Sequence, residues 1–292
     1  MSFQYGGQAV IEGVMMRGPG SRAIAVRRPD ESIVINEKKL GSITKRFPFL
    51  KLPFIRGVVM LFESLVMGIE ALSYSAEQAM GEEEEEKLSK WEMFLTIAVS
   101  LGLAIVLFIV IPTTLTYYTA TSIQDNFFRN IIEGVIRLAV FLGYVYAVSR
   151  MKDIQRVFMY HGAEHKVINA YEAGKDLTVE EVQKFSTLHP RCGTSFLLIV
   201  ILIKVVIFSG VTASGLMGQI FFRILLLPVV AGVAYELLKL SGKYQDKGIC
   251  RIFIAPGLWL QKLTTREPEN SQVEVAIKAL NAVLKEGDIH VR

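Results

Sequence analysis

The run MFLTIAVSLGLAIVLFIVIPTTLTY, residues 93–117, contains no charged side chain and decides the class of the fold. About 20 consecutive, mostly apolar helical residues cross a bilayer core of about 30 Å. Three further apolar runs, at residues 131–148, 196–211 and 220–240, come close to this requirement. The sequence therefore predicts an α-helical polytopic membrane protein with four transmembrane helices in two hairpins, beside a small cytoplasmic α+β part.

The composition excludes several classes of protein. The 292 residues are 51% hydrophobic and 21% charged, and the apolar residues are concentrated in those runs, which excludes a purely soluble globular protein. The rest of the chain is polar enough to fold in water, which excludes a protein made only of membrane helices. The net charge of +4 is too small to indicate a nucleic-acid partner. Two cysteines form no disulfide framework, and they fit a reducing compartment.

Lys and Arg are distributed unevenly between the segments that connect the four runs. Residues 1–90 hold twelve, residues 149–195 hold seven and residues 241–292 hold eight, whereas residues 118–130 hold one and residues 212–219 hold none. Cytoplasmic loops carry the excess of Lys and Arg. We therefore expect a multi-pass protein of the cytoplasmic (inner) membrane, with both termini and the central segment in the cytoplasm.

Several charged residues interrupt the last three apolar runs. Glu133 and Arg137 stand four positions apart and are expected to pair on one helix face. Lys204 and Arg223 are expected to extend toward the outer interface, and Glu236 lies near the cytoplasmic end of the fourth run. Ionisable residues inside a membrane are candidates for function by default, but local pairing and snorkelling would explain most of these without one.

The polar parts of the chain divide further. Residues 23–27 and 32–36 are short β-prone runs separated by a turn cluster. The glycine-rich run before them, residues 6–18, fits a strand with glycine bends better than an anion-binding loop. The expected regions, in chain order, are a β-rich region at 1–52, an interfacial or re-entrant helix at 53–80, an acidic linker at 81–90, the first hairpin at 91–148, a His/Cys segment at 149–195, the second hairpin at 196–240 and a C-terminal region with an amphipathic helix at 241–292.

The residues suited to chemistry begin at His161. His161, Glu164 and His165 occupy positions i, i+3 and i+4 of a segment that is expected to continue the second membrane helix, so the three share one helix face. This is the inverted zinc-protease pattern H-x-x-E-H, in which two imidazoles bind zinc and the carboxylate acts as general base. Glu164 is therefore the candidate catalytic residue.

A second element, His189 with Cys192, stands just before the third membrane helix, and its spacing suits a zinc site. Both elements border cytoplasmic helix ends, so His161, His165, His189 and Cys192 are predicted to form a tetrahedral zinc site. Two alternatives without a metal stay open. The histidines could cap helices, or Cys192 could act as a nucleophile with His161 or His189 as its base.

Four stretches of the sequence resemble the YqhQ-like family, a bacterial group of uncharacterised membrane proteins described as predicted metal-dependent enzymes. They are GGQAVIEGVMMRGP at 6–19, HGAEHK at 161–166, HPRCGT at 189–194 and APGLWLQ at 255–261. The resemblance covers nearly the whole chain. It implies a site that contains His161, Glu164, His165, His189 and Cys192, and it implies no established substrate or reaction.

Two functions from different classes follow. The first is a membrane-embedded, zinc-dependent, hydrolase-like enzyme whose cytoplasm-facing site acts on a lipid, a lipid-linked molecule or a membrane-proximal peptide, with Lys166 and Arg191 holding an anionic headgroup. The second is a non-catalytic scaffold, transporter or biogenesis factor with a structural His/Cys metal site. Four protein ligands would indicate a structural site, whereas three leave a position open for catalysis. The expected partners are membrane lipids, and a transporter with four helices would need to form a homo-oligomer.

Overall fold

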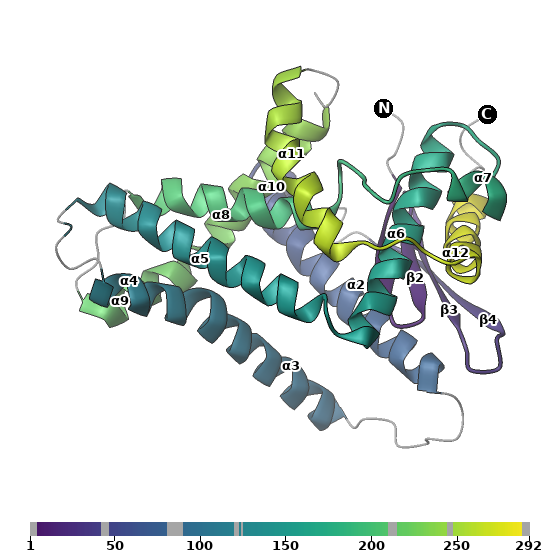
Figure 1. Cartoon of the computed structure of the whole chain (residues 1–292), viewed down its shortest axis with the longest axis horizontal. Helices are drawn as coiled ribbons and strands as arrows, with labels where there is room; N and C mark the ends of the chain where they lie inside the picture. The colour runs from purple at the N-terminus through teal and green to yellow at the C-terminus, as the bar shows by residue number, and fades with distance from the viewer. Residues whose placement is uncertain are drawn as a thin grey trace.

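The structure is a computed structural model that describes residues 5–41, 47–80, 90–119, 123, 125–209, 215–243 and 248–287. The chain folds into an elongated bundle of apolar helices with a small sheet and its covering helices at one end (Figure 1). The acidic linker expected at residues 81–90 lies almost wholly outside the described residues.

Four antiparallel strands form a meander in the order β1-β2-β3-β4. They span Gly6–Val10, Gly13–Arg17, Ser21–Arg27 and Ile33–Lys39. The β-rich N-terminal prediction is therefore confirmed, and the glycine-rich run at residues 6–18 forms the β1-β2 hairpin. The register pairs Gly13 with Val26 and Ser21 with Lys39.

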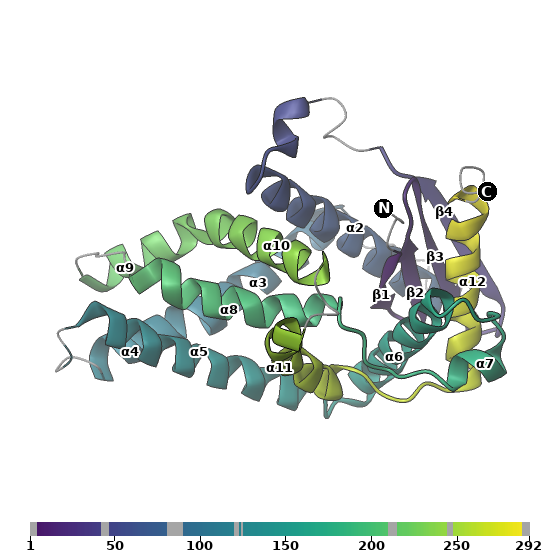
Figure 2. The ribbon, with the colours of Figure 1, turned by 90° about the horizontal axis from the view of Figure 1, so that it is seen from above.

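Helices cover both faces of this sheet (Figure 2). Helix α2, Ile55–Met80, lies on one face. Helices α6, Lys152–Glu172, and α12, Asn270–Gly287, lie on the other. A short 3-10 helix, η1 (Pro48–Lys51), precedes α2, and α7 (Val179–Gln183) follows α6. The amphipathic helix expected near the C-terminus is thus α12, and it packs on the sheet.

Alternate residues of the central strands face the two helical layers. Met16 and Ala25 contact the α6 and α12 layer, whereas Met15 and Ile24 contact α2. Successive side chains of a strand point to opposite faces. Because both faces are covered, the middle residues of the two central strands, 14–16 and 23–26, are all apolar and buried, and the sheet supports α6.

The bundle consists of the remaining helices: α3 (Lys90–Ile105), the π-helical segment η2 (Val106–Val110), α4 (Ile111–Thr119), α5 (Asn126–Val148), α8 (Gly193–Ser209), α9 (Gly215–Leu225), α10 (Leu227–Lys243) and α11 (Gly248–Thr264). Two stretches, Phe94–Thr119 and Phe128–Val148, are long and apolar enough to cross a membrane. The pair α9–α10, bent by 43°, would make a third if it is one span. Two or three spans are therefore supported among the described residues, where the sequence predicts four.

The expected continuation of the second membrane helix into α6 is wrong. Helix α5 ends at Val148, and Met151 is extended before α6 begins at Lys152. The peptide carbonyl of Ser149 at this break accepts hydrogen bonds from the side chains of Gln155 and Arg266, at 3.2 and 3.1 Å. These side chains replace the lost helical hydrogen bonds, which makes the break tolerable without proline or glycine.

The charged residues of the bundle differ in part from expectation. The pair of Glu133 with Arg137 is confirmed. Arg223 also pairs with Glu133, and both Arg223 and Lys204 are buried at 8% exposure, so the expectation that they extend toward the interface is wrong. Withdrawing Arg223 to water would leave the Glu133 carboxylate buried with less compensation, which is costly. Glu236 pairs with Arg56 of α2.

Candidate functional site

One turn of α6 brings together the three residues of the H-x-x-E-H pattern. The imidazole rings of His161 and His165 have centroids 4.4 Å apart. Oε2 of Glu164 lies 3.9 Å from Nε2 of each histidine. The side chains of this face are therefore arranged around one point, as the i, i+3, i+4 spacing predicts.

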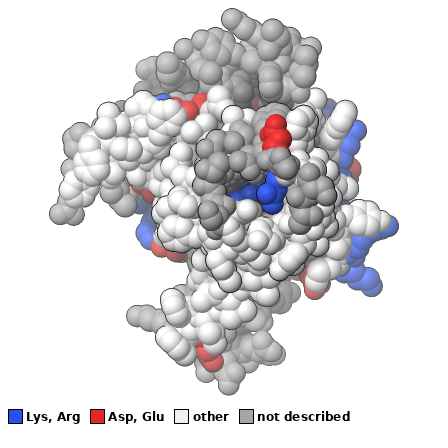
Figure 3. All heavy atoms as spheres, turned by 90° about the vertical axis from the view of Figure 1, so that its left-hand side faces the viewer, with Lys and Arg blue, Asp and Glu red and all other residues white. Residues whose placement is uncertain are grey.

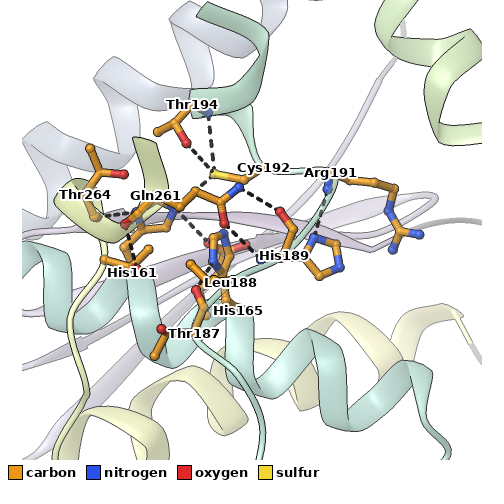
Figure 4. A network of polar contacts seen from close by, with 12 residues as sticks. His161, His165, Thr187, Leu188, His189, Arg191, Cys192, Thr194, Gln261 and Thr264 are labelled. Atoms are coloured by element: carbon orange, nitrogen blue, oxygen red, sulfur yellow. Dashed lines mark hydrogen bonds and ion pairs between the residues drawn. The ribbon is translucent and has the colours of Figure 1, made fainter. Parts of the chain in front are cut away.

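Backbone carbonyls orient both histidines (Figure 4). Nδ1 of His161 lies 2.8 Å from the carbonyl oxygen of Thr264, and Nδ1 of His165 lies 2.6 Å from that of Thr187. A carbonyl only accepts, so each Nδ1 carries the proton and each Nε2 keeps a free lone pair. Metal-binding histidines are held in this way, with the second nitrogen donating to a carbonyl or carboxylate.

Cys192 completes the group from a different part of the chain. It stands immediately before α8, and its Sγ accepts a hydrogen bond from the backbone N–H of Thr194 at 3.4 Å. The same sulfur lies 3.3 Å from Nε2 of His161. Ligand atoms of His161, His165 and Cys192 all lie within 4.8 Å of one another. The contact with His161 also fits the alternative of a thiol paired with an imidazole base.

His189 lies beside this group and is not part of it. Its ring centroid is 5.7 Å from that of His165. Its Nδ1 accepts the backbone N–H of Arg191 at 3.3 Å, and its Nε2 lies 3.5 Å from Oε2 of Glu172. Burial, together with the neighbouring His165, lowers the pKa of His189 to about 4. The imidazole is therefore neutral at physiological pH and points away from the sulfur.

The environment of Glu164 is unusual for a carboxyl group. It is buried, with 4% exposure. Burial raises its pKa above the ordinary value, and His161 and a hydrogen bond from the backbone N–H of Gly7 oppose this rise. A Cβ atom at Gly7 would lie 2.9 Å from Cγ of Glu164, so the glycine permits the close approach of β1 to this carboxyl group.

Both predicted headgroup cations have partners within the chain. Nζ of Lys166 lies 2.8 Å from both the carbonyl oxygen of Gln183 and Oε2 of Glu267, and the residue is 3% exposed. Arg191 pairs with Glu172. Neither cation can hold a headgroup in this arrangement without giving up these contacts.

The sequence did not reveal the role of Gln261. Its amide accepts the N–H of His189 at 2.9 Å and donates to the carbonyl of the same residue at 2.8 Å. This pair of bonds fixes the segment that leads to Cys192. The stretch at residues 255–261 carries the family resemblance, but a supporting amide has no spacing rule that would identify it.

Residues 52–286 match the family described as Protein of unknown function (DUF1385), and this range contains all the residues of the site. The chain is 39% identical over 293 residues to the protein described as Uncharacterized protein YqhQ from Bacillus subtilis (strain 168), with 96% of this chain and 92% of that protein covered. No solved structure matches the chain.

Proposed function

Because this chain belongs to the DUF1385 family, a family of unknown function, we propose a function from the geometry of its own site. The protein is a membrane-embedded, zinc-dependent hydrolase. The site faces the cytoplasm and acts on a lipid, a lipid-linked molecule or a membrane-proximal peptide. One observation carries the proposal. Two histidines whose Nδ1 atoms are held by backbone carbonyls, and one cysteine from another part of the chain, have ligand atoms within 4.8 Å of one another.

The donor set fits zinc. With Zn–N bonds of 2.0–2.1 Å and Zn–S bonds of 2.3 Å, ligand atoms of a tetrahedral site lie about 3.3–3.8 Å apart. The separation of 3.3 Å between Sγ of Cys192 and Nε2 of His161 agrees with this. Imidazole with thiolate selects zinc over magnesium or calcium. His161, His165 and Cys192 would hold the ion, which leaves one position free.

Glu164 is the residue we assign to proton transfer. Zinc bound there supplies a Lewis acid that polarises a carbonyl or phosphoryl oxygen of the substrate. The Glu164 carboxylate, 3.9 Å from both Nε2 atoms, would take a proton from the attacking water and return it to the leaving group. Its burial supports this role, because a raised pKa brings a carboxyl group nearer to the operating pH.

The membrane topology is part of the proposal. Two or three helices suited to crossing a membrane support a membrane location. The four spans are proposed from the apolar runs of the sequence, and the uneven distribution of Lys and Arg supports both termini in the cytoplasm. In this topology the break after α5 lies at the cytoplasmic surface. It directs α6 away from the bundle and onto the sheet, so the site stands where the bundle meets the cytoplasmic part (Figure 1).

A structural metal site is the second candidate, and burial favours it. His165 and Cys192 are only 2% and 7% exposed. In this case Glu164 would be the fourth ligand, and the closed site would fasten α6 to the segment before α8. Metal-binding energy is then folding energy, and loss of the metal unfolds the protein.

Metal analysis of the purified chain tests the proposal. We expect about one zinc per wild-type chain, loss of zinc in His161→Ala, and retention in the matched control His189→Asn, since His189 lies outside the group. Glu164→Gln should keep zinc and lose hydrolysis in the hydrolase, because it removes a base and not a ligand. In a structural site Glu164→Gln should instead weaken zinc binding. A well-folded, metal-free wild type would contradict both candidates.

A further inference from the structure

Four charged side chains are buried inside the helix bundle and are not part of the His/Cys group. Glu133 and Arg137 come from α5, Lys204 from α8 and Arg223 from α9. Their exposures are 3%, 5%, 8% and 8%. Charged residues inside a membrane protein face the bundle interior and mark sites for ions, protons or substrates.

Glu133 is shared between the two arginines. Its Oε1 accepts from Nε of Arg223 at 2.6 Å and from Nη2 of Arg137, and its Oε2 accepts from Nη2 of Arg223. Thr113 also donates to Oε1 at 3.1 Å. The acceptor capacity of this one carboxylate is therefore largely used by these four donors.

Lys204 is left without a partner of opposite charge. The turn of α8 that carries Lys204 packs against the turn of α5 that carries Glu133, because a Cβ atom at Gly134 would lie 2.6 Å from Cγ2 of Val205. Among the described residues, Lys204 has no hydrogen-bond or ion-pair partner. Three cations thus stand against one carboxylate, which is an excess of two positive charges in a buried place.

Burying an uncompensated charge is costly. The cost falls if the ammonium group of Lys204 gives up its proton, or if a bound anion supplies negative charge beside it.

The backbone is irregular where the cluster lies. Nε of Arg137 donates at 3.0 Å to the carbonyl of Phe108, which lies in the π-helical segment η2. Arg223 stands three residues before Leu226, where α9 and α10 meet at 43°. At membrane depth, broken helices occur where the backbone is buried in protein or lines a cavity, and π-helical segments are frequent at functional sites.

The bundle is hollowed at this end. Viewed from the end where α4 and α9 lie, the surface shows Lys or Arg atoms at the bottom of a hollow, with Asp or Glu atoms and uncharged atoms on the described part of its rim (Figure 3). We propose that the ammonium group of Lys204, which has no partner among the described residues, binds an oxyanion within the bundle, with the positive charges of Arg137 and Arg223 in support and separate from the His/Cys site. Guanidinium and ammonium groups bind phosphate oxygens with charge-assisted hydrogen bonds. The phosphate can come from solution or from an anionic phospholipid.

The test compares two probes on the full chain purified in detergent. Inorganic phosphate is titrated by calorimetry, and phosphatidylglycerol is compared with phosphatidylcholine for retention in native mass spectrometry. Lys204→Met is expected to weaken binding of the effective probe about tenfold or more, since it removes one charged donor of the site. Lys152→Met, which removes an exposed cation at the start of α6, is the matched control and should bind as wild type.

Each outcome decides the proposal. Phosphate binding that Lys204→Met weakens supports a site for dissolved anions, and selective retention of phosphatidylglycerol that Lys204→Met abolishes supports a lipid phosphate. Lys204→Glu supplies the missing negative charge and should raise Tm while abolishing binding, which shows that the fold survives at this position. If neither probe binds wild type, or if Lys204→Met and Lys152→Met bind equally, the proposal is overturned.

Discussion

Replacing Gly162 with alanine is expected to damage the site without changing any of its polar side chains. A Cβ atom at Gly162 would lie 2.0 Å from the carbonyl oxygen of Arg266, and Cβ contacts under 3.0 Å essentially do not occur. Either α6 or the segment around Arg266 must therefore move by at least about 1 Å, because close-packed interiors transmit such a clash. The same segment holds His161 through the carbonyl of Thr264.

The size of the effect follows from the distances. A shift of about 1 Å stretches the His161–Thr264 hydrogen bond from 2.8 Å to roughly 3.8 Å, where it no longer counts as a hydrogen bond. The bond from the N–H of Arg266 to the carbonyl of Phe158, at 3.0 Å, is lost with it. Loss of a group that orients a metal-binding histidine lowers metal affinity by about 10- to 100-fold. Overpacking lowers the free energy of unfolding by about 1–3 kcal/mol.

The assay measures zinc affinity by competition with a chromogenic chelator, and Tm in detergent. Gly143→Ala in α5 is the matched control, because nothing lies within 4 Å of the Cβ position there. It should keep the wild-type affinity and an equal or higher Tm, since alanine favours a helix. If Gly162→Ala also keeps wild-type affinity and Tm, the reasoning that this close approach orients His161 is refuted.

Three further predictions concern stability, acid sensitivity and topology. Glu133→Gln leaves two buried guanidinium groups without their carboxylate, so it should lower the free energy of unfolding by about 3–5 kcal/mol; a Tm equal to that of wild type would exclude a shared ion pair. His189 has a folded-state pKa of about 4 against its ordinary 6.5, so its contribution to stability is fully present above about pH 6.5 and is lost as the pH falls toward 4. The His189→Asn variant does not titrate, and its amide oxygen can still accept the N–H of Arg191. Its Tm should therefore fall less between about pH 7.5 and 5 than the Tm of wild type. An equal fall would show that protonation of His189 does not cause the loss of stability in acid. Met217→Cys, at a position 78% exposed, should react with an impermeant maleimide in right-side-out vesicles and not in inverted ones; the reverse pattern would reject the proposed topology.

The local part of the site could be predicted from the sequence. Three positions on one helix face follow from helical geometry alone, so the spacing places His161, Glu164 and His165 together. Cys192 could be assigned to the same place because both elements were expected to border the cytoplasmic ends of membrane helices. Likewise, the short β-prone runs at residues 23–27 and 32–36, the turn cluster between them and the glycine-rich run predicted the strands of the N-terminal part, because strand geometry is also a property of neighbouring residues.

The remaining features depend on contacts between distant parts of the chain. Gln261 reaches the backbone of His189 across 72 positions, and Arg223 reaches Glu133 across 90. Rules for helix faces consider pairs three or four residues apart and cannot find such partners. The break after α5 was missed for the same reason, because the side chain of Arg266, distant in sequence, helps to satisfy the carbonyl group there.

X-ray absorption at the zinc edge of the purified wild-type chain tests the central claim most directly. The account predicts about one zinc per chain, with one sulfur neighbour at about 2.3 Å and nitrogen or oxygen neighbours at about 2.0–2.1 Å. Cys192→Ser should remove the sulfur signal. A folded chain without zinc, or a zinc ion with no sulfur neighbour, would contradict a metal centre formed by His161, His165 and Cys192.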